Sequence, residues 1–216
     1  MQIKELNTFE DFVNKSVEFI HDVCKDNQTN IALSGGNTPK PIYEALSKSD
    51  IDFSKISFFQ VDERYTDRKN QNSNYKMINE SLISKIDSEF HFFDTTLEME
   101  ECLNKYEKDL QNIKNKFDLT ILGVGNDGHT ASLFPYEKGL FETRLVANTK
   151  TENFDVRNRL TVTYPLILNS KKILILLKGE EKREILEKIS ENKLKFVNFP
   201  IMKVLEHKDL TIHFVK

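Results

Sequence analysis

Residues 117–135 read FDLTILGVGNDGHTASLFP, an apolar run that passes into a glycine-rich turn. The apolar residues predict a buried strand at 117–124. The turn contains a G-x-G-x-x-G pattern at Gly123, Gly125 and Gly128, which after a strand is typical of dinucleotide-binding folds. The first question is therefore whether these glycines hold a dinucleotide.

A dinucleotide site has two further requirements that this turn does not meet. The glycines must open a helix long enough to face a pyrophosphate, but Pro135 curtails any helix here. An acidic residue is expected about 20 positions further on, where the chain has Asn148. The glycines instead favour a tight turn that projects Asp127 and His129 into a cleft.

Strand and helix patterns alternate along most of the chain. Strands are predicted at 30–33, 56–61, 91–95, 117–124, 144–149, 159–164, 172–177 and 210–215. Helices are predicted at 9–24, from 38 or 39 to 49, and at 75–86, 96–115 and 179–191. Strands separated by helices indicate a mainly parallel sheet with helices on both faces. We predict an α/β fold, a three-layer α/β/α sandwich with a Rossmann-like open sheet, formed by a single domain over residues 1–216.

The composition excludes several classes of partner. With 38% hydrophobic residues, 30% charged residues and a formal net charge of −3, the chain has no basic field for nucleic acid or a membrane surface. No stretch has the apolar length of a signal peptide or a membrane span. Cys24 and Cys102 fall within helical patterns and are expected to be reduced thiols. These features predict a cytoplasmic protein, and no pattern indicates its oligomeric state.

Four polar loops follow predicted strands, at 34–39, 62–64, 123–129 and 178–182. Ligands of open parallel sheets bind beyond the carboxyl ends of the strands. We therefore expect these loops to form one site.

The loop at 34–39 reads SGGNTP and predicts a phosphate site. Gly35 and Gly36 allow a tight turn with free backbone N–H groups, and Ser34, Asn37 and Thr38 add side-chain donors. The alternative is a strand-to-helix turn in which Thr38 caps the helix.

The sequence DER at 62–64 offers an arginine to a ligand. The forked guanidinium of Arg64 suits a phosphate or a carboxylate, and Asp62 or Glu63 could fix its direction. The alternative is a polar strand end in which Arg64 forms a surface ion pair.

His129 differs from the other four histidines in its surroundings. It follows a glycine, lies two residues after Asp127, and precedes the small polar residues Thr130 and Ser132. A histidine in this setting suits general-base catalysis near neutral pH, although a packing role is the alternative. No cysteine or second histidine lies at the spacing of a zinc site.

Taken together, these motifs resemble those of the 6-phosphogluconolactonases of the glucosamine/galactosamine-6-phosphate isomerase superfamily. SGGNTP is similar to S-G-G-[ST]-T-P, VDER has the D-E-R strand end, and GVGNDGHTASLFP matches G-x-G-x-D-G-H-T-A-S-L-F-P. RLTVTYPLIL and ILILLKGEEK resemble the later R-[IL]-T-[LV]-T and G-x-x-K segments, so the resemblance spans 31–182. The related amino-sugar deaminases carry G-H-I-A-F-N-E-P and usually D-E-Y, which favours the lactonase branch. Asn37 and the absence of tryptophan near the C-terminus depart from the pattern.

The resemblance implies a carboxylic ester hydrolase that converts 6-phospho-D-glucono-1,5-lactone to 6-phosphogluconate in the oxidative pentose phosphate pathway, without an organic cofactor or metal. His129 would carry the proton and Asp127 would orient it. Loop 34–38, Arg64 and Lys182 would hold the phosphate, with Arg159 as a further candidate. The supporting residues would be Asp62, Gly123, Gly125 and Gly128. The alternatives are a glucosamine-6-phosphate isomerase/deaminase and a non-catalytic sugar-phosphate sensor.

Overall fold

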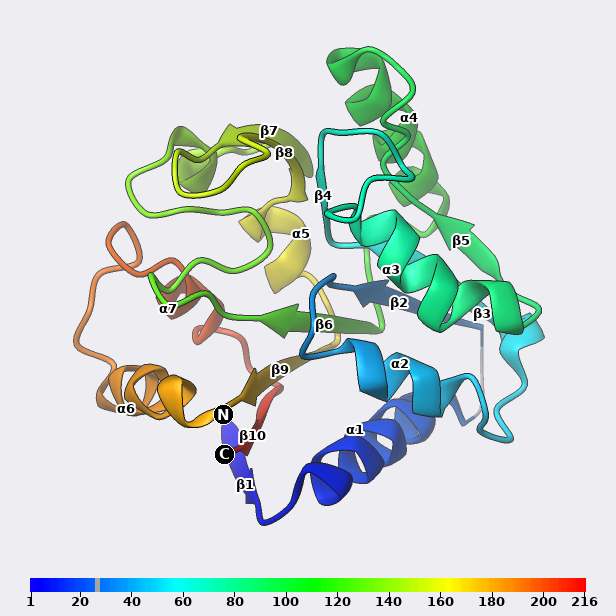
Figure 1. Ribbon diagram of the computed structural model, residues 1–216. Coiled ribbons are helices and arrows are strands. Elements are labelled where there is room, and N and C mark those ends of the chain that lie inside the picture. The colour runs from blue at the N-terminus through cyan, green and yellow to red at the C-terminus, as the bar shows by residue number, and fades with distance from the viewer. Residues whose placement is uncertain (26–27) are drawn as a thin grey trace.

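The computed structural model describes residues 1–25 and 28–216, and this part of the chain contains two sheets (Figure 1). The larger sheet is parallel throughout, with the order β1 (Gln2–Leu6), β10 (Leu210–Val215), β9 (Lys172–Lys178), β6 (Leu119–Gly123), β2 (Thr29–Leu33), β3 (Ile56–Gln60) and β5 (Glu89–His91). The smaller sheet is antiparallel and contains β4 (Asp62–Arg64), β8 (Asn158–Val162) and β7 (Val146–Lys150).

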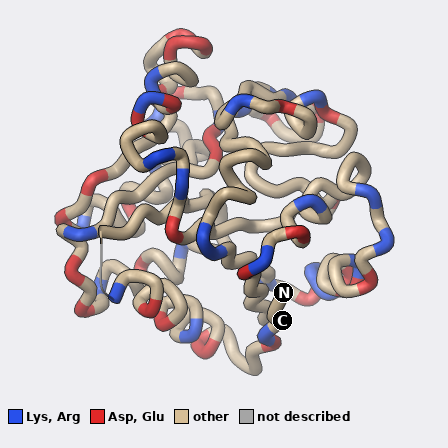
Figure 2. Tube along the Cα trace, turned by 180° about the vertical axis from the view of Figure 1, so that it is seen from behind, with Lys and Arg blue, Asp and Glu red and all other residues tan. Residues whose placement is uncertain are grey.

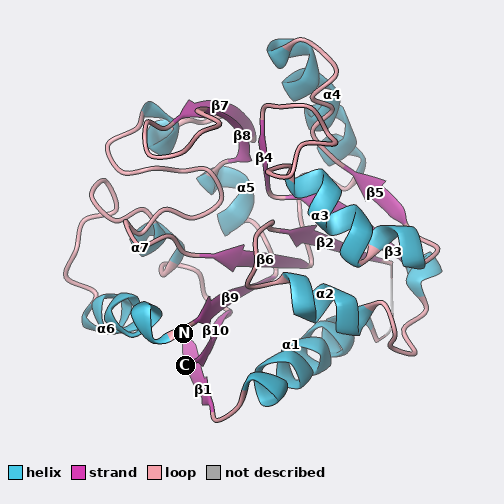
Figure 3. Ribbon diagram, in the orientation of Figure 1, coloured by secondary structure: helices cyan, strands magenta, loops and turns pink. Residues whose placement is uncertain are grey.

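Helices cover both faces of the larger sheet (Figure 3). One face carries α1 (Phe9–Cys24), α2 (Lys40–Leu46) and α3 (Asn74–Ser81), and the other carries α4 (Met99–Asn112), α5 (Tyr164–Leu168), α6 (Arg183–Glu191) and α7 (Ile201–Val204). Short 3₁₀ helices lie at Phe53–Lys55, Ile83–Lys85, Lys138–Phe141 and Glu180–Lys182. The predicted three-layer α/β/α arrangement is confirmed.

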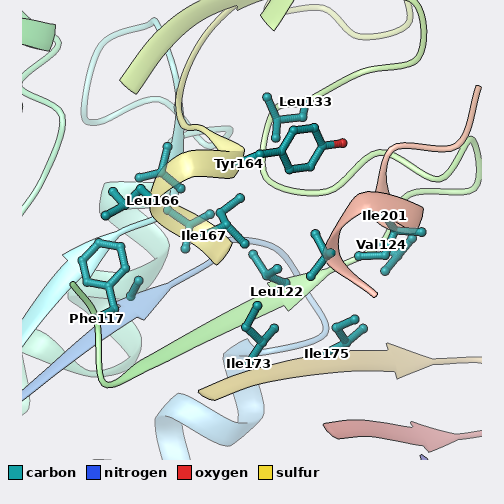
Figure 4. Close-up of a cluster of buried hydrophobic side chains, with 14 of the residues drawn as sticks. Phe117, Leu122, Val124, Leu133, Tyr164, Leu166, Ile167, Ile173, Ile175 and Ile201 are labelled. Atoms are coloured by element: carbon teal, nitrogen blue, oxygen red, sulfur yellow. The ribbon is translucent and has the colours of Figure 1, made fainter. Parts of the chain in front are cut away.

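The two cores follow from the alternation of side chains along each buried strand. In β9, Leu174 faces the α1 side, whereas Ile173 and Ile175 face the α5 side. Figure 4 shows the α5 side, where Leu166 and Ile167 pack over β6 and β9. Both faces must be apolar, so the strand reads as a continuous hydrophobic run.

Most predicted elements are present, with shifted ends. Thr8 caps α1, since its Oγ1 accepts a hydrogen bond from the N–H of Asp11 at 3.0 Å. Helix α2 starts at Lys40, later than predicted, because residues 37–39 form a turn. Strand β5 ends at His91, whereas a strand was predicted at 91–95. The backbone N–H of Phe93 donates to the Gln60 side chain and not to a neighbouring strand.

Strand β1 and the helices α5 and α7 were not predicted. The edge strand β1 pairs with β10 on one side, and its polar residues hide the strand pattern. No element was predicted at 165–168 or 201–204, where most of α5 and all of α7 lie, and residue 164 begins α5 rather than ending a strand.

The smaller sheet is the largest departure from the predicted single sheet. Residues 62–64 form the separate strand β4 and are not the end of strand 56–61. The chain leaves the larger sheet at Val61, whose N–H donates to Leu33 and whose carbonyl accepts from Val162. This crossing places β4 and β8 above the carboxyl end of β2 (Figure 1).

The distribution of charged residues and the state of the two cysteines agree with the expectations from the sequence. Figure 2 shows basic and acidic residues interspersed along the chain trace. Cys24 and Cys102 are free, and burial raises the pKa of each thiol to about 12. Within residues 1–25 and 28–216, no helix has the length and apolar character needed to cross a bilayer.

Candidate active site

One cavity of about 210 Å³ opens at the carboxyl edge of the larger sheet. The loops after β2, β6 and β9 line it, together with β4, β8 and the loop between β7 and β8. The predicted site residues along its wall are Ser34, Gly35, Gly36, Asn37, Thr38, Asp62, Arg64, Gly123, Gly125, His129, Arg159 and Lys182. Asp127 and Gly128 are not among the lining residues.

His129 and Asp127 form a hydrogen-bonded pair. The Nδ1 atom of His129 lies 2.6 Å from Oδ1 of Asp127, and the same oxygen accepts from the backbone N–H of His129 at 3.1 Å. Burial raises the pKa of Asp127, but the hydrogen bond and charge of His129 outweigh it and hold that pKa below its usual range. The carboxylate therefore fixes the ring orientation and stabilises a positive charge on the ring.

The glycine turn makes room for the His129 ring. The N–H of Gly125 donates to the carbonyl of His129 at 2.8 Å, so the turn folds back on itself. A Cβ at Gly125 would overlap the imidazole. Gly128 has φ +79°, which favours glycine, and a Cβ there would overlap Phe199.

Two aromatic rings flank the imidazole. The Phe134 ring lies 4.9 Å from it between centroids, and the Phe154 ring meets it edge-on at 5.8 Å. The His129 side chain remains 21% exposed, and none of the described residues hydrogen-bonds its Nε2. This nitrogen is therefore available to a ligand or to water.

The loop after β2 lines the cavity, but its Ser34 side chain is engaged within the protein. The Ser34 hydroxyl, predicted as a ligand donor, donates instead to the carbonyl of Ile121 at 2.7 Å. Gly36 has φ +102°, and a Cβ at Gly35 would overlap the Asn74 side chain. Glycine is needed at both positions for the chain to take this path.

Arg64 and Arg159 occupy paired positions on β4 and β8. Arg159 is 5% exposed and lies over the Phe154 ring at 5.3 Å, and burial together with the charge of Arg64 lowers its pKa. Among the described residues no carboxylate forms an ion pair with either guanidinium, and the Nε atom of each is buried without a partner. Two unpaired cations on one wall favour an anionic ligand.

The prediction that Asp62 or Glu63 directs the Arg64 guanidinium is wrong. The guanidinium donates to the Asn72 carbonyl, whereas Glu63 accepts from the backbone N–H of Arg64 at 2.7 Å. Asp62 accepts from Ser132 instead. Each carboxylate meets a nearer donor, so neither reaches the guanidinium.

Lys182 joins the loop after β9 to the glycine turn. Its Nζ donates to the Val124 carbonyl at 2.9 Å and to the Asn126 side chain at 2.6 Å. Burial lowers the pKa of Lys182, although the charges of Glu181 and Asp127 act in the opposite direction. Lys182 therefore contributes positive charge to the cavity from the side of β9.

Several residues of the cavity wall were not among the predicted site residues, and Asn74 and Phe154 are two of them. Asn74 lies in a polar stretch with no pattern of its own, and Phe154 lies on the loop between β7 and β8. Neither position carries a local signal, because each reaches the cavity only through the tertiary fold.

Comparison with known proteins gives a consistent result. The family model described as "Glucosamine-6-phosphate isomerases/6-phosphogluconolactonase" matches residues 6–213. The chain belongs to this family. A "Probable 6-phosphogluconolactonase" of Dictyostelium discoideum is 35% identical over 221 residues, covering 95% of this chain and 94% of that protein. A 6-phosphogluconolactonase of Thermotoga maritima is 38% identical over 188 residues, covering 86% and 83%.

Comparison with solved structures shows the same fold. The crystal structure of the Thermotoga maritima 6-phosphogluconolactonase matches with a TM-score of 0.89 at 32% identity, covering 99% of this chain and 98% of that one. A monomeric glucosamine-6-phosphate deaminase matches with a TM-score of 0.90 at 22% identity, which shows the common fold alone.

Proposed function

We propose that the protein hydrolyses 6-phospho-D-glucono-1,5-lactone to 6-phosphogluconate in the pentose phosphate pathway, as a carboxylic ester hydrolase. The observation that carries the proposal is that the His129–Asp127 pair opens on the same cavity as two arginines without carboxylate partners. A proton carrier beside an anion-binding wall suits an ester whose substrate bears a phosphate. The relatives named 6-phosphogluconolactonase support this substrate.

His129 acts as the general base. With Nδ1 held by Asp127, the neutral ring presents Nε2 as its proton acceptor. Nε2 takes a proton from the water that attacks C1 of the lactone, and the carbonyl becomes a tetrahedral oxyanion. As the bond from C1 to the ring oxygen breaks, the imidazolium returns the proton to that oxygen. Asp127 stabilises the cation between these steps.

The phosphate is anchored by charge and by backbone donors. Arg64 and Arg159 supply two guanidiniums, Lys182 supplies an ammonium, and loop 34–38 supplies N–H groups. Holding the phosphate fixes the distance between the lactone carbonyl and the base, which lowers the entropic cost of reaction.

The proposed parts are sufficient for this reaction. A positioned general base contributes about 10²–10⁴-fold to the rate. A lactone is an activated ester that water attacks directly, so no covalent nucleophile is needed. The sequence has no G-x-S-x-G nucleophile elbow.

The test is hydrolysis of freshly generated 6-phosphogluconolactone by purified protein, followed by acid release. His129→Ala should lower kcat by at least about 10²-fold with little change in KM, because the base acts in the transition state. His21→Ala is the matched control, since this histidine lies on the exposed side of α1. Full activity in His129→Ala would overturn the mechanism, and ammonia release from glucosamine-6-phosphate would favour the deaminase activity instead.

A further inference from the structure

A buried carboxylate in the cavity has no role in the steps above. Asp62 is the only acidic residue among the described residues of the cavity wall, and it is 7% exposed. Its Oδ2 accepts a hydrogen bond from the Ser132 hydroxyl at 2.7 Å. None of the described residues donates to its Oδ1. Oδ1 is not among the atoms of the described residues that are buried without a partner, and Asp62 lines the cavity, where its charge also acts on Arg159. This oxygen is therefore open to the cavity and can accept a hydrogen bond from a ligand.

The Asp62–Ser132 pair is held rigidly from both sides. The Asn74 side-chain amide donates to the Asp62 carbonyl at 2.8 Å, and Asp62 faces Thr161 in the β4–β8 ladder. The hydroxyl of Thr161 accepts from the backbone N–H of Ser132 at 3.1 Å, and the Ser132 carbonyl accepts from Thr149 at 2.6 Å. Both partners are therefore positioned before a ligand enters.

The chemistry of Asp62 restricts what it can contact. An ionised carboxylate only accepts hydrogen bonds, and it repels the phosphate of the substrate and the carboxylate of the product. The cations Arg64, Arg159 and Lys182 are better suited to the anionic groups, and none of these three forms an ion pair with Asp62, although the charge of Asp62 acts on Arg159. The neutral donors of a phosphosugar lactone are its ring hydroxyls.

We propose that Asp62 determines specificity for the sugar by accepting a hydrogen bond from one ring hydroxyl of the bound phosphosugar, with Ser132 fixing the carboxylate. This inference rests on the proposed function and adds to it a contact that recognises the sugar ring. A site built around such an acceptor rejects an analogue that lacks the hydroxyl, because the carboxylate oxygen then has no donor in the filled cavity.

The test compares the parent lactone with its 2-, 3- and 4-deoxy analogues. For the wild-type protein, kcat/KM should fall at least about 10-fold for the analogue without the contacted hydroxyl and much less for the others. In Asp62→Asn the parent lactone should lose a similar factor, and the penalty for that one deoxy analogue should shrink to less than about threefold. Ser132→Ala should reduce the same penalty in part, because the carboxylate loses its orienting donor.

Asp155→Asn is the matched control. It removes one negative charge from the exposed loop between β7 and β8, outside the main cavity, and should keep the wild-type discrimination. An Asp62→Asn variant that discriminates against the deoxy analogues as strongly as the wild type does would overturn the role of Asp62.

The design separates this inference from the proposed function. Hydrolysis of the parent lactone by the wild type tests the function alone. If Asp62→Asn fails to fold, the wild-type series still decides, since equal kcat/KM for the parent and every deoxy lactone would refute the hydroxyl contact. If the wild type has no lactonase activity, the affinities for 6-phosphogluconate and its deoxy analogues are measured by calorimetry instead. Equal affinities for all of them would then refute the hydroxyl contact.

Discussion

Gly125 controls where the catalytic ring can lie. A Cβ at this position would overlap the His129 imidazole and come within 2.8 Å of Asp127 Oδ1. Gly125→Ala should therefore displace the ring and lower kcat at least about 10-fold, while the free energy of unfolding changes by about 1 kcal/mol or less. Steady-state kinetics and urea unfolding would measure the two effects.

Gly123 provides the comparison for this substitution. It ends β6 directly before this turn, and a Cβ there meets no atom of the described residues within 4 Å. Gly123→Ala should lose much less activity than Gly125→Ala. Equal losses in the two variants would show that the turn backbone, and not the space for the ring, limits activity.

At the scale of elements, His213 joins β10 to α1. It is fully buried, and its Nδ1 lies 2.9 Å from the Ser16 hydroxyl on α1. Burial, with a smaller effect from the charge of Lys4, lowers the pKa of His213 from 6.5 to about 4. The folded state therefore favours the neutral ring, and the unfolded chain takes up a proton first as the pH falls.

The expected result is acid sensitivity between these two pKa values. The contribution of His213 is complete above about pH 6.5 and is lost as the pH falls towards 4. Between pH 7.5 and 5 the wild type should lose about 2 kcal/mol more unfolding free energy than His213→Gln, which cannot titrate. Urea midpoints at the two pH values measure this, and parallel losses in both proteins would contradict it.

At the scale of the whole molecule, Glu63 ties the smaller sheet to the layer around α3. Its buried carboxylate accepts five hydrogen bonds, from the side chains of Gln60 and Ser73 and the backbone N–H groups of Arg64, Asn74 and Tyr75. Burial raises the pKa of Glu63, although the backbone donors lower it.

Glu63→Gln replaces one carboxylate oxygen, which accepts from these donors, with an amide NH₂ group that cannot accept. Leaving buried donors unpaired should cost about 3 kcal/mol of unfolding free energy, or roughly 5–10 °C in Tm. Thermal unfolding would measure the loss. Glu18→Gln, at an exposed side chain of α1, should shift Tm by less than about 2 °C. A similar Tm in both variants would contradict the bridging role.

We expect residues 1–216 to unfold as one cooperative unit. The two sheets meet at Val61, which is hydrogen-bonded to Leu33 at 3.0 Å and to Val162 at 2.9 Å. Far-UV circular dichroism and the fluorescence of the six tyrosines should therefore give the same urea midpoint. Two separated midpoints would indicate that the smaller sheet forms a domain of its own.

The sequence by itself determined the α/β class, most of the strands of the large sheet and the residues of the glycine turn. These features are local: a strand buried on both faces is apolar throughout, and Asp127 reaches His129 within one turn. The loops at the strand ends were also predictable, because parallel strands deliver their carboxyl ends to one edge.

Only the tertiary structure decided the rest of the wall. Asp62 meets Ser132 across 70 positions, Asn74 fills the space beside Gly35, and Phe154 covers Arg159. The smaller sheet that brings these residues together exists because the chain leaves the large sheet at Val61. Contacts between residues distant in sequence depend on how whole elements pack, and no periodicity within a single element records them.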